Sequence, residues 1–127
     1  MSEPCLFDYA IIRLVPHVEL EEFINVGVIL SCPKFDFLDC LIGLNDERLS
    51  AFAPDLDPAV VRGYLDIIPR ICAGDESSGE IAHLTQRERF YWLTAQRSTI
   101  IQSSPVHTGL TTDPGETLES LFAKAVS

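Results

Sequence analysis

The residue types that could do chemistry gather in one stretch near the end of the chain, RSTIIQSSPVHTGLTTDP at 97–114. The polar loop within this stretch holds the hydroxyl and imidazole side chains of Ser103, Ser104, His107 and Thr108. Hydroxyl groups beside an imidazole are used in nucleophilic catalysis and in proton transfer. We predict that a strand over 98–103 leads into a polar loop carrying these groups, because loops held by regular elements often contain binding and catalytic residues.

His107 is the candidate catalytic residue of this stretch. Ser104 lies three residues before it, and Asp113 could complete a hydrolytic triad. However, Pro105 separates the serine from the histidine, and the chain has no G-x-S-x-G elbow. Proton transfer by His107 alone is the better-supported chemistry, since an imidazole titrates near neutral pH. Whether the protein is an enzyme stays open.

A second interpretation of the 97–109 loop is a site for a small anionic or nucleotide-like ligand. Arg13 and Arg97 would hold the anion, because a guanidinium binds carboxylate or phosphate through a planar fork. The groups that would orient the ligand are Gln102, Ser104, His107 and Thr108. No Gly-rich phosphate loop accompanies them, and Gly109 is expected in a turn with positive φ.

Arg13 also has structural interpretations, because it lies inside the apolar run at 7–15. A buried guanidinium needs a partner, for which Glu19 and Glu22 are the nearest choices along the chain. It could instead stand at the edge of a sheet, with its head in water. Arg87, Arg89 and Arg97 fall within eleven positions, and for these three arginines internal pairing with Asp or Glu is the alternative to a ligand site.

The acidic composition excludes some partners. Nine basic and nineteen acidic side chains give a net charge of −10. We therefore expect neither nucleic acid nor a membrane surface as a partner, because both attract Lys and Arg. No zinc-ligand spacing such as H-E-x-x-H or paired C-x-x-C occurs, so no metal site is predicted, and no cofactor is indicated.

The cysteines indicate a reducing compartment. Cys5, Cys32, Cys40 and Cys72 form no C-x-x-C pair, and the first residues do not resemble a signal peptide. No apolar run approaches the length of a membrane span. We expect reduced thiols and a cytoplasmic protein. A disulfide between Cys32 and Cys40, on facing arms of a hairpin, is the alternative.

The elements that position these residues follow from periodicity and from helix start signals. Residues rich in β-branched and aromatic types predict strands over 7–15, 25–31, 37–43 and 98–103. Capping residues and helical spacing predict helices over 46–53, from 58 to about 73, over 85–95 and after Asp113. Pro69 should kink or end the second helix, 74–80 should be a flexible loop, and Trp92 should face inward.

The order of these elements predicts the fold class. Strands come early in the chain and helices follow, which favours α+β over an alternating parallel fold. We predict one domain over 1–127 with a mostly antiparallel sheet of about four strands. The helices are expected to pack on one face of this sheet.

Three stretches resemble a bacterial family known as domain of unknown function 3037: FDYAIIRLVPHVELEEFINVGVILSCP, RLSAFAPDLD and RSTIIQSSPVHTGLTTDP. The most specific patterns run from Glu21 to Leu30 and from Ser104 to Leu110. The resemblance implies no activity, but some members of the family are genomic companions of HipA-like serine/threonine kinases. We therefore expect an interaction or regulatory module, with a HipA-like kinase as its partner and an acidic surface that steers it to basic groups.

Overall fold

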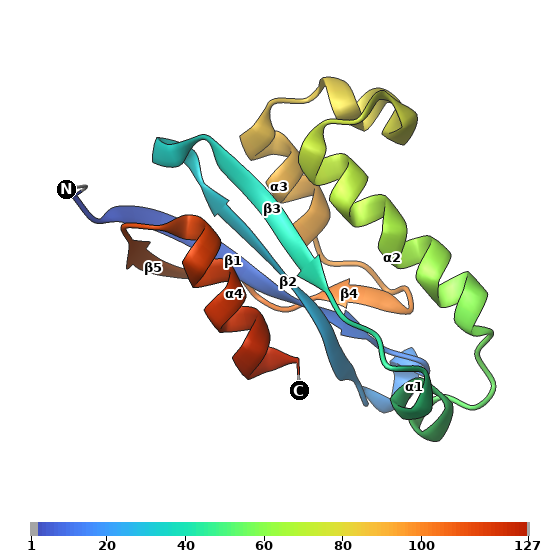
Figure 1. The fold of residues 1–127 in the computed structure, drawn as a ribbon. Helices are drawn as coiled ribbons and strands as arrows, with labels where there is room; N and C mark the ends of the chain where they lie inside the picture. Colours follow the sequence, from blue (N-terminus) through green and yellow to red (C-terminus); the bar gives the residue numbers. More distant parts are fainter. Residues whose placement is uncertain (1–2, 127) are drawn as a thin grey trace.

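The structure, a computed structural model, describes residues 3–126 and is built around one antiparallel sheet (Figure 1). Within that range the strands are β1 Cys5–Leu14, β2 Ile24–Cys32, β3 Phe37–Ile42, β4 Ile101–Ser103 and β5 His107–Thr111. Their order is β3-β2-β1-β4, and β5 also pairs with β1. The predicted α+β class and antiparallel sheet are confirmed, and β5 is a strand that the sequence did not predict.

β4 and β5 lie end to end along the same edge of β1. In β4, Ser103 pairs with Ile12, and continuing that register would pair Tyr9 with Val106. Tyr9 pairs with His107 instead, so the register shifts by one residue between the two strands. The break falls at Pro105, which has no N–H to give to a ladder. The prediction of a polar loop here is therefore wrong, because most of its residues belong to an interrupted edge strand.

The helices begin at capping residues. The structure has α1 Asp46–Phe52, α2 Pro58–Ala73, α3 Gln86–Thr94 and α4 Pro114–Ala125, with 3-10 turns η1 Val18–Leu20, η2 Pro33–Phe35 and η3 Glu76–His83. The side chains of Asn45, Asp57, Thr85 and Asp113 accept hydrogen bonds from the first turns of the α-helices. η3 replaces the predicted flexible loop after Gly74.

Pro69 does not end α2, so this alternative of the prediction is wrong. The helix continues to Ala73 and closes at Gly74, which has a φ of 70°. Pro69 stands in the last turns, where Ile68 and Ile71 on either side of it are buried. Burial of these side chains offsets the loss of one backbone hydrogen bond.

Helices cover both faces of the sheet (Figure 1). Side chains alternate along β1, so Ala10 and Ile12 pack with α1, α2 and α3, whereas Phe7 packs on the opposite face with Leu118 of α4. The prediction that the helices pack on one face holds for α1, α2 and α3. α4 takes the other face because both sides of β1 are apolar and each needs a cover.

The cysteines are free. Cys32 lies in the core on the α4 side of the sheet, whereas Cys40 lies in the core on the α2 side. Because these thiols point to opposite faces, the alternative of a disulfide between them is wrong. Burial raises the pKa of the Cys32 thiol, and a hydrogen bond with Cys40 together with burial raises that of Cys72.

Candidate functional site

Arg13 is a partly buried cation that pairs with no carboxylate of residues 3–126. It stands near the end of β1, and its guanidinium carbon lies 4.1 Å from the centre of the Phe23 ring. Its Nε is buried and has no hydrogen-bond acceptor within the same range. The predicted salt bridge is wrong, since both Glu19 and Glu22 are exposed and neither pairs with it. A buried hydrogen-bond donor without an acceptor is rare in a folded protein, so the surroundings of Arg13 need a specific explanation.

An open cavity of about 800 Å³ lies against Arg13. We call it the arginine cavity, and its main polar and aromatic walls are Arg13, Glu21, Phe23, Arg97, Gln102 and Ser103. It brings together residues from η1, β1, β4 and the segment after α3. Of the predicted ligand-binding residues, it therefore unites Arg13, Arg97 and Gln102.

Arg97 is held at the C-terminal end of α3. Its guanidinium donates to the carbonyl oxygens of Trp92 and Ala95 and lies 4.3 Å from the centre of the Trp92 ring. Carbonyls at a helix end have no partner within the helix, which is why a cation is favoured there. Within residues 3–126 no carboxylate pairs with Arg97, so the alternative of internal ion pairing is wrong.

Ser104 has a structural role. It is 3 % exposed, and its Oγ accepts a hydrogen bond from the backbone N–H of Ile11 at 2.8 Å and donates to the Pro105 carbonyl at 2.9 Å. The hydroxyl thus replaces the backbone acceptor that is missing where the edge strand breaks. It does not line the arginine cavity.

His107 and Thr108 lie on β5, away from the arginine cavity. His107 is exposed, and its ring lies against that of Tyr9 in a tilted arrangement, with 5.3 Å between ring centres. Tyr9 lies four positions before Arg13 on β1, which is roughly 13 Å along a strand. Thr108 donates to the Asp8 carboxylate at 2.7 Å. The structure therefore brings neither His107 nor Thr108 to the cavity that Arg13 and Arg97 line.

Gly109 is needed for packing and not for a turn. It is part of β5, and a Cβ there would lie 2.8 Å from the Phe7 ring on the neighbouring strand. Within residues 3–126 the glycines with positive φ are Gly74 and Gly79. The prediction of a turn at Gly109 is therefore wrong.

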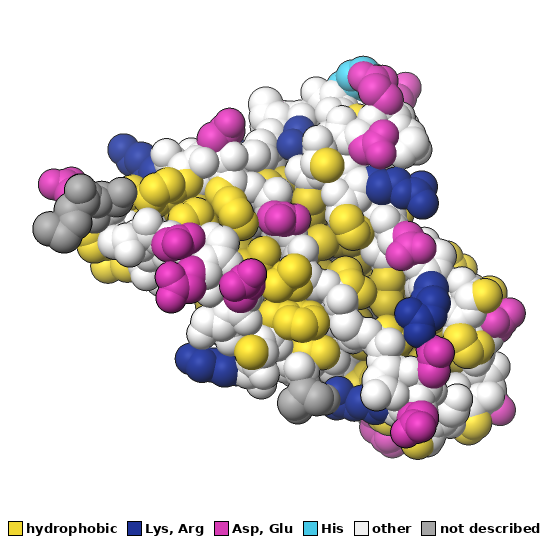
Figure 2. All heavy atoms as spheres, viewed as in Figure 1, with side chains coloured by type: hydrophobic (Ala, Val, Ile, Leu, Met, Phe, Trp, Pro, Cys, Tyr) yellow, Lys and Arg dark blue, Asp and Glu magenta, His cyan; other side chains and the backbone are white. Residues whose placement is uncertain are grey.

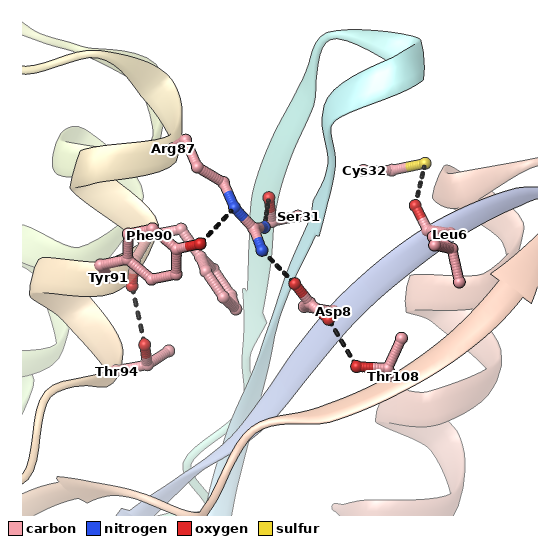
Figure 3. Close-up of polar contacts among 9 residues, drawn as sticks. All are labelled: Leu6, Asp8, Ser31, Cys32, Arg87, Phe90, Tyr91, Thr94 and Thr108. Atoms are coloured by element: carbon pink, nitrogen blue, oxygen red, sulfur yellow. Dashed lines mark hydrogen bonds and ion pairs between the residues drawn. The ribbon is translucent and has the colours of Figure 1, made fainter.

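A polar cluster joins α3 to the sheet (Figure 3). It confirms the predicted internal ion pairing for Arg87, although the sequence did not indicate its partners. Arg87 donates to the Asp8 carboxylate, to Ser31 Oγ at 2.9 Å and to the Tyr91 hydroxyl at 3.1 Å. Burial acts to raise the pKa of Asp8, but hydrogen bonds from Thr108 and Arg87 outweigh it and the pKa is lowered. The contact between Arg87 and Asp8 joins residues 79 positions apart, so no local sequence pattern could indicate it.

An apolar cleft of about 510 Å³ lies on the α2 side of β4. Its exposed walls include Tyr64 at 54 %, Ile67 at 42 % and Trp92 at 39 % exposure. The prediction that Trp92 faces inward is therefore wrong, because α3 buries Phe90 instead and presents the indole to Arg97. Arg97 borders both the cleft and the arginine cavity.

An acidic groove of about 610 Å³ separates β3 from α4. Its lining residues are Phe37, Asp39, Leu41, Asp113, Gly115, Glu116, Leu118 and Glu119. Figure 2 shows the acidic side chains over α4 beside a band of hydrophobic side chains that continues toward α2. Among the described residues, four carboxylates and no basic side chain line this groove, so it has a strongly negative character.

Metal-ligand clusters and membrane-spanning helices are absent from the described part of the chain. No group of three or more His, Cys, Asp or Glu side chains among residues 3–126 is placed to hold a metal ion. Over the same residues, no helix combines the length and apolar character needed to cross a membrane.

The fold and surfaces define a class of protein: an α+β protein whose antiparallel sheet is covered by helices on both faces, with an arginine cavity at one sheet edge and an acidic groove beside the other. Residues 9–126 match the model of a family described as "Protein of unknown function (DUF3037)". The chain belongs to this family, which confirms the resemblance predicted from its motifs. Searches of curated proteins and of solved structures found no match.

Proposed function

We propose that this protein is an interaction and regulatory module of the cytosol that binds a basic, extended segment of a protein partner. The observation that carries the proposal is the acidic groove between β3 and α4, which the described residues line with four carboxylates, an apolar floor and no basic side chain. Interfaces use such charge complementarity to select a partner and to speed association.

The backbone of β3 supports an extended segment as the bound element. β3 ends the strand order and, within residues 3–126, pairs with β2 alone. A free strand edge offers unpaired N–H and C=O groups to an incoming strand. Apolar side chains of that strand would pack on Phe37 and Leu41, while its Lys and Arg would reach Asp39 and Glu119.

A HipA-like kinase is the partner proposed for this groove. The family resemblance supports this choice, because some members are genomic companions of such kinases. The net charge of −10 would steer a basic segment of the kinase toward the module from a distance. By binding that segment, the module would regulate the kinase.

The test is binding of a purified HipA-like kinase from the same genome to wild type and to Asp39→Asn/Glu119→Gln. The Asp39 carboxylate accepts the Cys40 N–H at 2.8 Å, and an asparagine amide oxygen can accept it in the same way, so the substitutions remove charge and little else. The matched control is Asp66→Asn/Glu80→Gln, whose exposed carboxylates lie outside the groove.

We expect the groove variant to bind roughly two- to thirtyfold more weakly, from the 0.2–1 kcal/mol typical of each exposed ion pair. The loss should lie mainly in the association rate and should shrink as salt is added. Absence of wild-type binding, or an equal loss in the control, contradicts the proposal.

A second candidate function is binding of a small anionic ligand. The observation that favours it is Arg13 in the arginine cavity, whose buried Nε has no acceptor among residues 3–126. No reaction is proposed with it, because His107 does not line that cavity.

A further inference from the structure

We propose that the arginine cavity is a binding site for a small polar molecule that carries a carboxylate or phosphate group, with Arg13 as the main anion contact. The site lies at the β4 edge of the sheet, on the opposite side from the acidic groove at β3. The inference deepens the second candidate function and rests on it, but it is independent of the partner proposed for that groove, so each of these two proposals can fail without the other.

The first argument is the charge left uncompensated in the cavity. The protein has nineteen acidic side chains for nine basic ones, so carboxylate partners are plentiful. Nevertheless, no carboxylate of residues 3–126 pairs with Arg13 or Arg97, whereas Arg62 and Arg87 each have an aspartate partner. Arg89 also lacks a carboxylate partner and has a buried Nε without an acceptor, but its guanidinium donates to the carbonyls of Leu84 and Cys72 and does not line the cavity. An oxyanion bound in the cavity would supply the negative charge that no carboxylate supplies to the guanidinium groups of Arg13 and Arg97.

The second argument is the buried Nε of Arg13. A buried donor that gives up water without gaining an acceptor is costly, more so when it carries charge. The aromatic ring of Phe23 stabilises the cation but offers no hydrogen-bond acceptor to an in-plane N–H. Because this Nε is closed to solvent, a ligand in the open cavity would meet the outer nitrogens of the guanidinium, and its negative charge would stabilise the cation as a whole.

The third argument is that the walls are already fixed in place. Arg97 is held by two carbonyl oxygens and the Trp92 ring, and the Gln102 amide donates to the Thr99 carbonyl at 2.8 Å. Arg13 is held by β1 and the Phe23 ring. A site whose side chains are ordered before binding loses less conformational entropy when a ligand arrives.

The remaining walls indicate a polar ligand. Glu21, Gln96, Ser98, Gln102 and Ser103 present carboxylate, amide and hydroxyl groups around the cavity. The Glu21 carboxylate would accept from ligand hydroxyl groups at a distance from the bound oxyanion. About 800 Å³ is within the range of small-molecule sites.

The test uses three probes that share a three-carbon skeleton: glycerol 3-phosphate, glycerate and uncharged glycerol. Affinity is measured by calorimetry at constant ionic strength set with sodium chloride. The Arg13 Nε–Hε resonance is followed by NMR in the wild-type protein, so the result does not depend on a variant that folds. Arg13→Gln removes the charge, Arg13→Lys keeps it without the fork, and Arg62→Gln on α2 is the matched control.

We expect one or both charged probes to shift the Arg13 resonance saturably, and the better one identifies the oxyanion. Arg13→Gln should weaken its binding by about ten- to a hundredfold, as charge-assisted hydrogen bonds do, and Arg13→Lys by less. Arg62→Gln should bind as wild type does. The proposal is overturned if neither charged probe gives a saturable shift, if glycerol binds equally well, or if Arg62→Gln weakens binding as much as Arg13→Gln.

Discussion

Replacing Ser104 by alanine tests whether the edge of the sheet depends on its hydroxyl. The Ile11 N–H donates to Ser104 Oγ at 2.8 Å, and the Ser104 N–H donates back to the Ile11 carbonyl at 2.8 Å. Ser104 is 3 % exposed, so water cannot easily replace the lost oxygen. The Ile11 N–H would be left buried without an acceptor, which costs about 1–3 kcal/mol.

The assay is urea unfolding followed by circular dichroism, with Ser98→Ala as the control for removal of an exposed hydroxyl. We expect Ser104→Ala to lower the free energy of unfolding by about 1–3 kcal/mol at an unchanged m value. Ser98→Ala should change it by less than about 0.5 kcal/mol. Equal effects of the two substitutions would refute the structural role of Ser104 and return it to the candidates for a ligand site.

Three further predictions concern stability and reactivity. The pKa of Asp8 is lowered, so its stabilisation is present above the ordinary pKa of about 3.9 and is lost as pH falls through the lowered value. In urea unfolding, Asp8→Asn should therefore cost ~1–3 kcal/mol near neutral pH and less in strong acid; a cost independent of pH would contradict this. In thermal unfolding, Gly109→Ala should destabilise the protein by about 1–3 kcal/mol, because the new Cβ meets the Phe7 ring. The control Gly63→Ala, which has open space around it in α2, should not destabilise. A neutral effect of Gly109→Ala would argue against the packing role. With Ellman's reagent, the partly exposed Cys5 should react rapidly in the native protein and the buried Cys72 only after unfolding, so rapid native modification of Cys72 would exclude this core.

The parts of the fold that the sequence predicted are those with strong local signals. β1, β2 and β3 were predicted within about two residues, because runs of apolar β-branched residues bury both faces of these strands. The helix starts at Asn45 and Asp57 followed from side chains that accept backbone hydrogen bonds. β5 carried no such signal, since most of its residues are exposed at a sheet edge and its glycine weakens strand propensity. Its pairing with β1 depends on contacts about a hundred residues apart.

Some of the predicted site residues line the arginine cavity and others do not, and this difference has a physical cause. Residue type alone made Ser104 and His107 prominent, but Ser104 completes a backbone hydrogen-bond pattern and the His107 ring lies against the Tyr9 ring of β1. The fold thus gives each of these side chains a structural contact. Arg13 is different, because its described surroundings leave a buried donor and a positive charge unsatisfied. A group whose requirements the fold does not meet is the stronger indicator of a ligand, and this is why the arginine cavity, and not the serine–histidine pair, is the place to look for binding.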